Sequence, residues 1–114
     1  MIDTGAAHHS TAGYSQLIAL QKHQNVQVDK TKAGAIIVQF GIGKATSIGA
    51  VIVKTPIGNV DFYVIQADTL FLLSLKDLDL LGVYFNNLIN RIQFGDSDKK
   101  PISVIRRFGY PFLL

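Results

Sequence analysis

The chain has 114 residues, of which 48% are hydrophobic, and a formal net charge of +3. This length allows one domain with an apolar core, the lack of cysteine excludes disulfides and thiolate zinc sites, and the small positive charge is too weak to argue for nucleic acid. No apolar run is long enough for a membrane span, since Ser74 and Lys76 interrupt the longest one. No signal peptide is expected, because Met1 leads directly into a polar segment that contains glycine.

The first part of the chain carries weak signals for regular structure. Residues 12–23 leave helix and strand open, because their apolar side chains suit either one. Residues 26–29 alternate like a short strand, and residues 30–34 are typical of a turn.

Three runs of β-branched residues predict the main strands. They lie at 35–40, 46–53 and 60–65. A glycine-rich turn at 41–44 joins the first two runs, and a turn at 55–59 containing Pro, Gly and Asn joins the second to the third.

The following segment predicts a single helix. A short apolar run at 70–73 precedes leucines that recur at every third position from Leu75 to Leu81, with charged residues between them. Gly82 follows as a stop signal, so we expect one short amphipathic helix here.

The last segment predicts a hairpin and a tail. Residues 83–94 are typical of a hairpin that turns at two asparagines. We expect a polar linker at 95–100, a last strand at 102–105 and a tail at 106–114. Many short strands with one helix predict an all-β barrel.

The triplet Asp3-Thr4-Gly5 is the strongest chemical signal in the chain. Asp is a general base for water at mildly acidic pH, and two such carboxylates held about 3 Å apart share one proton. One of them takes a proton from water while the other protonates the peptide carbonyl. The triplet occurs once, so the second Asp must come from a second copy of the chain. Taken alone, three residues fit a turn after a strand better than an active site.

Three other patterns are weaker. Residues 41–46 mimic part of a phosphate loop, but Val38 and Ala45 stand where that motif needs Gly and Ser or Thr. The adjacent His8 and His9 point apart in most backbones, with no Cys or Glu to complete a metal site. Basic residues near the C-terminus are better read as a solvated linker than as a contact for an acidic partner.

Taken together, four segments resemble a known family. Residues 3–10, DTGAAHHS, resemble the D-[ST]-G-A-[SA]-x-H stretch of the retropepsin-like aspartic proteases of copia-type (Ty1/copia) retrotransposon Gag-Pol polyproteins. Residues 40–43, FGIG, resemble the tip of that family's flap hairpin. Residues 71–82, FLLSLKDLDLLG, resemble its N-L-L-S-x-x-x-L-x-x-x-G segment, and residues 107–113 its G-H-P-F segment before the integrase, with Tyr110 in place of the usual His.

The resemblance implies a closed retropepsin-like β-barrel protomer with one short α-helix, over residues 1–95, and a linker or tail over 96–114. Two copies form the enzyme, an aspartic endopeptidase that cleaves the element's own polyprotein. The partners implied are a second copy and a polyprotein peptide, with no cofactor, no metal, no membrane and no direct nucleic-acid contact. The implied location is intracellular, in the cytoplasm or a virus-like particle.

The resemblance also assigns roles to residues. Asp3 is catalytic, Thr4 holds the two loops of the dimer together through crossed hydrogen bonds, and Gly5 allows their close approach. The substrate-binding positions implied are Ala6, Gly41, Ile42, Gly43, Leu72, Leu73 and Ser74.

One departure from the family leaves an alternative function open. Only Met1 and Ile2 precede Asp3, so we expect the strand before the triplet to be short and the dimer to be weak. The alternative is a catalytically inactive retropepsin-like fragment, or a domesticated module for dimerisation or interaction.

Overall fold

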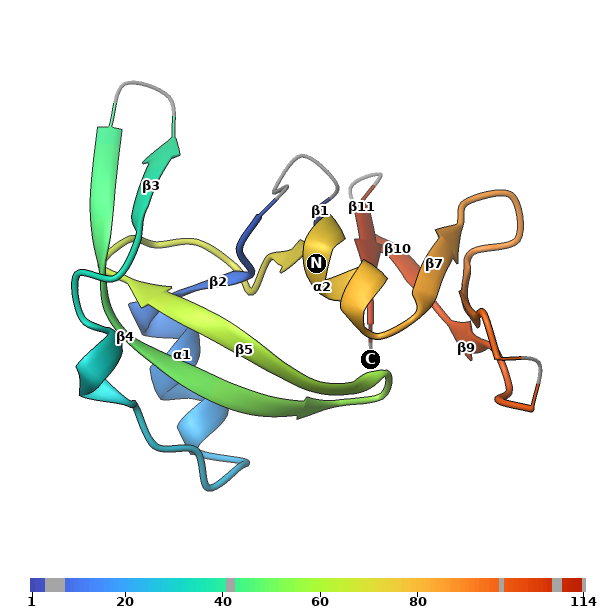
Figure 1. The fold of residues 1–114 in the computed structure, drawn as a ribbon, viewed down its shortest axis with the longest axis horizontal. Coiled ribbons are helices and arrows are strands. Elements are labelled where there is room, and N and C mark those ends of the chain that lie inside the picture. Colours follow the sequence, from blue (N-terminus) through green and yellow to red (C-terminus); the bar gives the residue numbers. More distant parts are fainter. Residues whose placement is uncertain (4–7, 41–42, 97, 108–109, 114) are drawn as a thin grey trace.

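A computed structural model describes residues 1–3, 8–40, 43–96, 98–107 and 110–113 (Figure 1). The described residues are rich in β-strand, which confirms the prediction of a small β-rich protein. The strands are β1 (Ile2–Asp3), β2 (Thr11–Gly13), β3 (Ile37–Phe40), β4 (Gly43–Thr55), β5 (Gly58–Ile65), β6 (Leu73–Ser74), β7 (Val83–Asn86), β8 (Arg91–Phe94), β9 (Ile102–Ser103), β10 (Ile105–Arg107) and β11 (Tyr110–Phe112). The helices are α1 (Tyr14–Gln21), α2 (Leu75–Leu80) and the 3-10 turn η1 (Lys30–Lys32).

The described strands form four separate sheets. The largest has the order β2-β5-β4-β3, a second has the order β7-β8-β9, and β1-β6 and β10-β11 are pairs. A closed barrel requires every strand to have two neighbours, whereas β2 and β3 are edges of the largest sheet. The expected closed barrel is therefore not found among the described residues.

A long hairpin of β4 and β5 dominates the largest sheet. The two strands pair from Ser47 opposite Ile65 to Thr55 opposite Gly58, so the predicted strands and the turn between them are confirmed. A bulge at Ser47 to Gly49 interrupts the ladder. A Cβ at Gly49 would lie 2.3 Å from Cγ1 of Val28, so the glycine lets another segment cross the strand here.

Two segments differ from the sequence expectation in the first part of the chain. Residues 26–29 form no strand, because only Asp29 makes an isolated bridge, to Ala50. The ambiguous segment 12–23 divides into the end of β2 and helix α1. Only Leu17 of α1 is buried, which explains why its apolar pattern was too weak to predict a helix.

The predicted helix and hairpin are confirmed. Ser74 caps α2, and Gly82 follows it with a positive φ of 67°. Strands β7 and β8 pair from Val83 opposite Phe94 to Asn86 opposite Arg91. Among the described residues other than glycine, Asn90 is the one with a positive φ, 51°, so the left-handed position lies later in the turn than the sequence indicated.

The described part of the predicted linker and tail contains paired strands and a buried side chain. Strand β9 pairs with β8, and Val104 is buried in the same core as the largest sheet. The described residues of 106–114, expected as a tail, contribute to an antiparallel pair of strands, β10-β11. The domain boundary after residue 95 stays a prediction.

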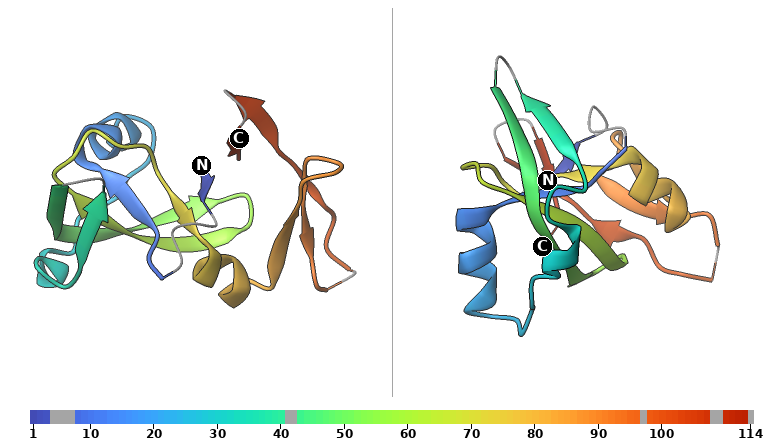
Figure 2. Two further views of the ribbon diagram at one scale, coloured as in Figure 1. Left: turned by 90° about the horizontal axis from the view of Figure 1, so that it is seen from above. Right: turned by 60° about the vertical axis from the view of Figure 1, so that its left-hand side comes forward.

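The core joins the parts of the molecule that surround β1. It contains Ile2, Leu17, Val64, Leu78 and Ile92, from the strands and from both α-helices. Figures 1 and 2 show β1 and β11 near each other, between the largest sheet and the β7-β8-β9 sheet. Burying Ile2 in this core holds the backbone of the residue that follows it, Asp3. None of the described helices has the length and apolar character needed to cross a membrane.

Candidate functional site

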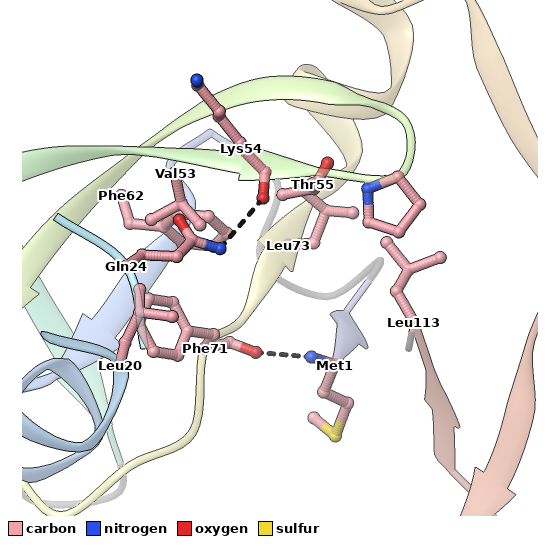
Figure 3. Close-up of a pocket in the computed structure, with 11 residues that line it drawn as sticks. Met1, Leu20, Gln24, Val53, Lys54, Thr55, Phe62, Phe71, Leu73 and Leu113 are labelled. Carbon is pink, nitrogen blue, oxygen red and sulfur yellow. Dashed lines mark hydrogen bonds between the residues drawn. The ribbon is translucent and has the colours of Figure 1, made fainter. Parts of the chain in front are cut away.

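The backbone of Asp3 lies beside the apolar segment that precedes α2. Strand β1 pairs in parallel with β6, with Ile2 opposite Leu73 and Asp3 opposite Ser74. The amide of Leu73 donates to the carbonyl oxygen of Met1 at 2.7 Å, and the amino group of Met1 donates to that of Phe71 at 2.6 Å (Figure 3). The pairing unites two segments that the family resemblance had linked only by their order in the chain.

The chain returns to the opposite side of the same segment. The amide of Thr11 donates to the carbonyl oxygen of Leu72 at 3.0 Å, and the amide of Leu72 donates back at 2.8 Å. The carbonyl oxygen of Ser10 accepts from the amide of Tyr63 in β5 at 3.0 Å. Residues 72–74 therefore lie between β1 and Thr11, and both ends of the segment that begins with Asp3 are anchored.

A polar cluster joins these segments. Ser10 and Ser74 are buried, with 1% and 0% of their surface exposed, and both hydroxyls lie within hydrogen-bond distance of Oδ2 of Asp77. The amide of Asp77 donates to Oγ of Ser74 at 3.2 Å, which caps α2. The roles of Ser10 and Asp77 were not predicted from the sequence, although Ser74-Leu75-Lys76-Asp77 has the spacing of a helix-capping motif.

The β3-β4 hairpin contains the predicted flap. Its strands pair from Ile37 opposite Thr46 to Phe40 opposite Gly43. Its end extends beyond the β4-β5 pairing, which begins only at Ser47, and Figure 1 shows it projecting from the sheet. Gly43 is the first residue of β4, and the predicted tip residues Gly41 and Ile42 lie outside the described residues.

The other predicted site residues divide into two groups. Thr4, Gly5 and Ala6 lie outside the described residues, and of Asp3 only the backbone is described. Leu73 and Ser74 are buried in the protomer, whereas Leu72 is partly exposed. Their contact with a substrate stays a prediction.

An apolar pocket of about 280 Å³ lies on another side of β1 (Figure 3). Its described lining comes from the chain ends, α1 and the segment after it, the β4-β5 hairpin and the residues before α2: Met1, Leu20, Gln24, Val53, Lys54, Thr55, Pro56, Phe62, Phe71, Leu73 and Leu113. None of these residues lies in the part of the chain where β3 and β4 pair, residues 37–46.

The described side chains offer no metal centre. They contain no group of three His, Cys, Asp or Glu that is arranged to hold an ion. The ring of His9 lies edge-on to Tyr63, with 5.3 Å between the ring centroids. Compared with models of protein families and with curated protein sequences, the chain gives no match.

Proposed function

We propose that this chain is the protomer of a homodimeric aspartic endopeptidase of the retropepsin type, which matures the polyprotein of a copia-type retrotransposon. Asp3 from each of two copies supplies one carboxylate of the dyad. The two carboxylates share a proton, so that one activates water while the other protonates the carbonyl of the scissile bond. The protomer is proposed to have the family's acid-protease fold.

The parallel pairing of Asp3 with Ser74 carries this proposal. It brings the start of the DTGA segment against the FLLS segment, and these are two of the motifs on which the family resemblance rests. If the triplet were only a turn after a strand, pairing with a segment as distant in the sequence as Ser74 would not be required. The proposal is also supported by the antiparallel pairing of β3 with β4, which lies between the two motifs in the chain.

Cleavage by the unaltered chain and by Asp3→Asn tests the proposal. The substrate is a library of unstructured peptides at mildly acidic pH, and Asp79→Asn is the matched control, since Asp79 is an exposed carboxylate on α2. We expect Asp3→Asn to abolish turnover with the fold unchanged, and Asp79→Asn to cleave normally. A transition-state mimic of the statine type should block the reaction, because such compounds bind tighter than substrate.

The same experiment separates the alternative function. A dimer in sedimentation velocity that cleaves no peptide indicates an inactive interaction module with this fold. Cleavage that survives in Asp3→Asn overturns the aspartic protease.

A further inference from the structure

Ser10 and Ser74 are distant in sequence and lie together around one carboxylate oxygen. The hydroxyl of Ser10 donates to Oδ2 of Asp77, and the hydroxyl of Ser74 donates to the same oxygen at 3.1 Å. Each serine oxygen also accepts a backbone amide. The amide of Ser74 donates to Oγ of Ser10 at 2.9 Å, and the amide of Asp77 donates to Oγ of Ser74 at 3.2 Å.

In this set of bonds, each serine hydroxyl donates one hydrogen bond and accepts one. A hydroxyl has one proton to donate, and both hydroxyl protons go to Asp77, which leaves the serine oxygens free to accept. The two oxygens of Ser10 and Ser74 also lie 3.3 Å apart, so the members contact one another as a closed triangle. A buried network whose members are all satisfied is rigid, and removing one member leaves a polar group of another without its partner.

The cluster differs from an ordinary capping box in one respect. In a capping box, the side chain three residues into the helix turns back to the amide of the N-cap residue. Here the amide of Ser74 is taken by Ser10, and the carboxylate of Asp77 receives the two hydroxyls instead. The beginning of α2 therefore depends on a residue that lies 64 positions earlier in the sequence than the cap residue Ser74.

We propose that Ser10 and Asp77 are positioning residues for Asp3, acting through Ser74. Asp3 lies opposite Ser74 on one side of β6, and Ser10 binds the amide and approaches the hydroxyl of Ser74. Both described ends of the segment from Asp3 to Ser10 therefore lie beside one buried residue, Ser74. The part of this inference that concerns catalysis rests on the proposed function, whereas the part that concerns the backbone of β1 does not.

Amide hydrogen exchange in Ser10→Ala and Asp77→Ala tests the backbone part. The probe is the amide of Leu73, which donates to Met1 in the β1-β6 pair and does not contact the cluster directly. We expect this amide to exchange about tenfold faster in both variants, because unpaired buried polar groups loosen the pair. Amides of β4 and β5 should exchange within about twofold of the unaltered chain.

Two further comparisons keep the test specific. Asp77→Asn retains one carbonyl oxygen as acceptor, so its effect should be smaller than that of Asp77→Ala. Asp79→Ala and Ser103→Ala remove exposed side chains of the same two types, on α2 and β9, and should leave Leu73 unchanged.

Peptide cleavage by the same variants tests the catalytic part. We expect kcat to fall about tenfold in Asp77→Ala with KM within about twofold, since a displaced catalytic group loses rate rather than binding. Unchanged exchange at Leu73, or an equal acceleration throughout β4 and β5, overturns the positioning role. An unchanged kcat in an active enzyme overturns its catalytic part. Faster exchange at Leu73 in a chain that cleaves no peptide supports the positioning of β1 and counts against the protease.

Discussion

Asp3 and Ser74 face each other across the parallel β1-β6 pair, although they are far apart in the sequence. Ile2, before Asp3, and Leu73, before Ser74, are both buried in the hydrophobic core. Apolar packing therefore holds this pair from one side, and the polar cluster of Ser10, Ser74 and Asp77 holds it from the other.

The double substitution Gly41→Val and Gly43→Val should impair peptide turnover far more than thermal stability. Gly43 ends the described β3-β4 pairing, and β-branched residues restrict the dihedral angles that a tight turn between two strands needs. Under the proposed function, this hairpin also has to close over the substrate. The measurements are kcat/KM and the melting temperature, with Lys44→Val, at an exposed neighbouring position, as control. Equal losses of activity and stability would show that these glycines have a structural role.

Gly13→Ala should destabilise the fold by about 1–3 kcal/mol. A Cβ at Gly13 would lie 2.3 Å from the carbonyl oxygen of Thr69 and 2.6 Å from that of Ala67, so the backbone would have to shift. Gly95→Ala is the matched control, because its nearest contact, the carbonyl oxygen of Gly82, lies at an ordinary 3.4 Å. Urea unfolding of both variants measures the difference. Equal stability of the two would contradict the close crossing at Gly13.

Leu78→Ala should cost about 2–5 kcal/mol in the free energy of unfolding. Leu78 is 2% exposed and is the buried residue of α2. Leu80→Ala on the same helix removes a side chain that is 74% exposed, and its effect should stay within about 0.5 kcal/mol. Chemical denaturation of the two variants compares them directly. Similar losses would mean that α2 packs through a different face.

The carboxyl of Asp29 should titrate below its ordinary pKa of 3.8. The hydroxyl and the backbone amide of Thr31 donate to the charged form and lower the pKa, with a smaller contribution from Lys32. A lowered pKa in the folded state means that the stabilisation of η1 is present above the unfolded value and is lost as the pH falls through the folded one. Carbon-13 NMR titration measures the pKa, and Thr31→Val should move it back toward 3.8. A pKa that does not respond to Thr31→Val would contradict this arrangement.

Local sequence patterns predicted the elements whose causes are local. The β-branched runs and the turn around Pro56 became the β4-β5 hairpin, and the leucine spacing with Gly82 became α2. The sequence left helix and strand open for the segment of α1, because this helix buries only Leu17 and so lacks an apolar stripe. The prediction of a strand at 26–29 was wrong, because the backbone of this segment makes only an isolated bridge to the sheet, from Asp29 to Ala50.

The sequence by itself determined that the protein is small and rich in β-strands. It also determined the main hairpins, the short helix α2 and the order of the motifs along the chain. Only the tertiary structure decided that Asp3 lies beside Ser74, that Ser10 completes the cap of α2, and that the described strands form separate sheets. The physical reason is the separation in sequence between the residues that interact. Turns, caps and strand periodicity depend on neighbouring residues, whereas parallel pairing and buried hydrogen bonds join residues that no local pattern relates.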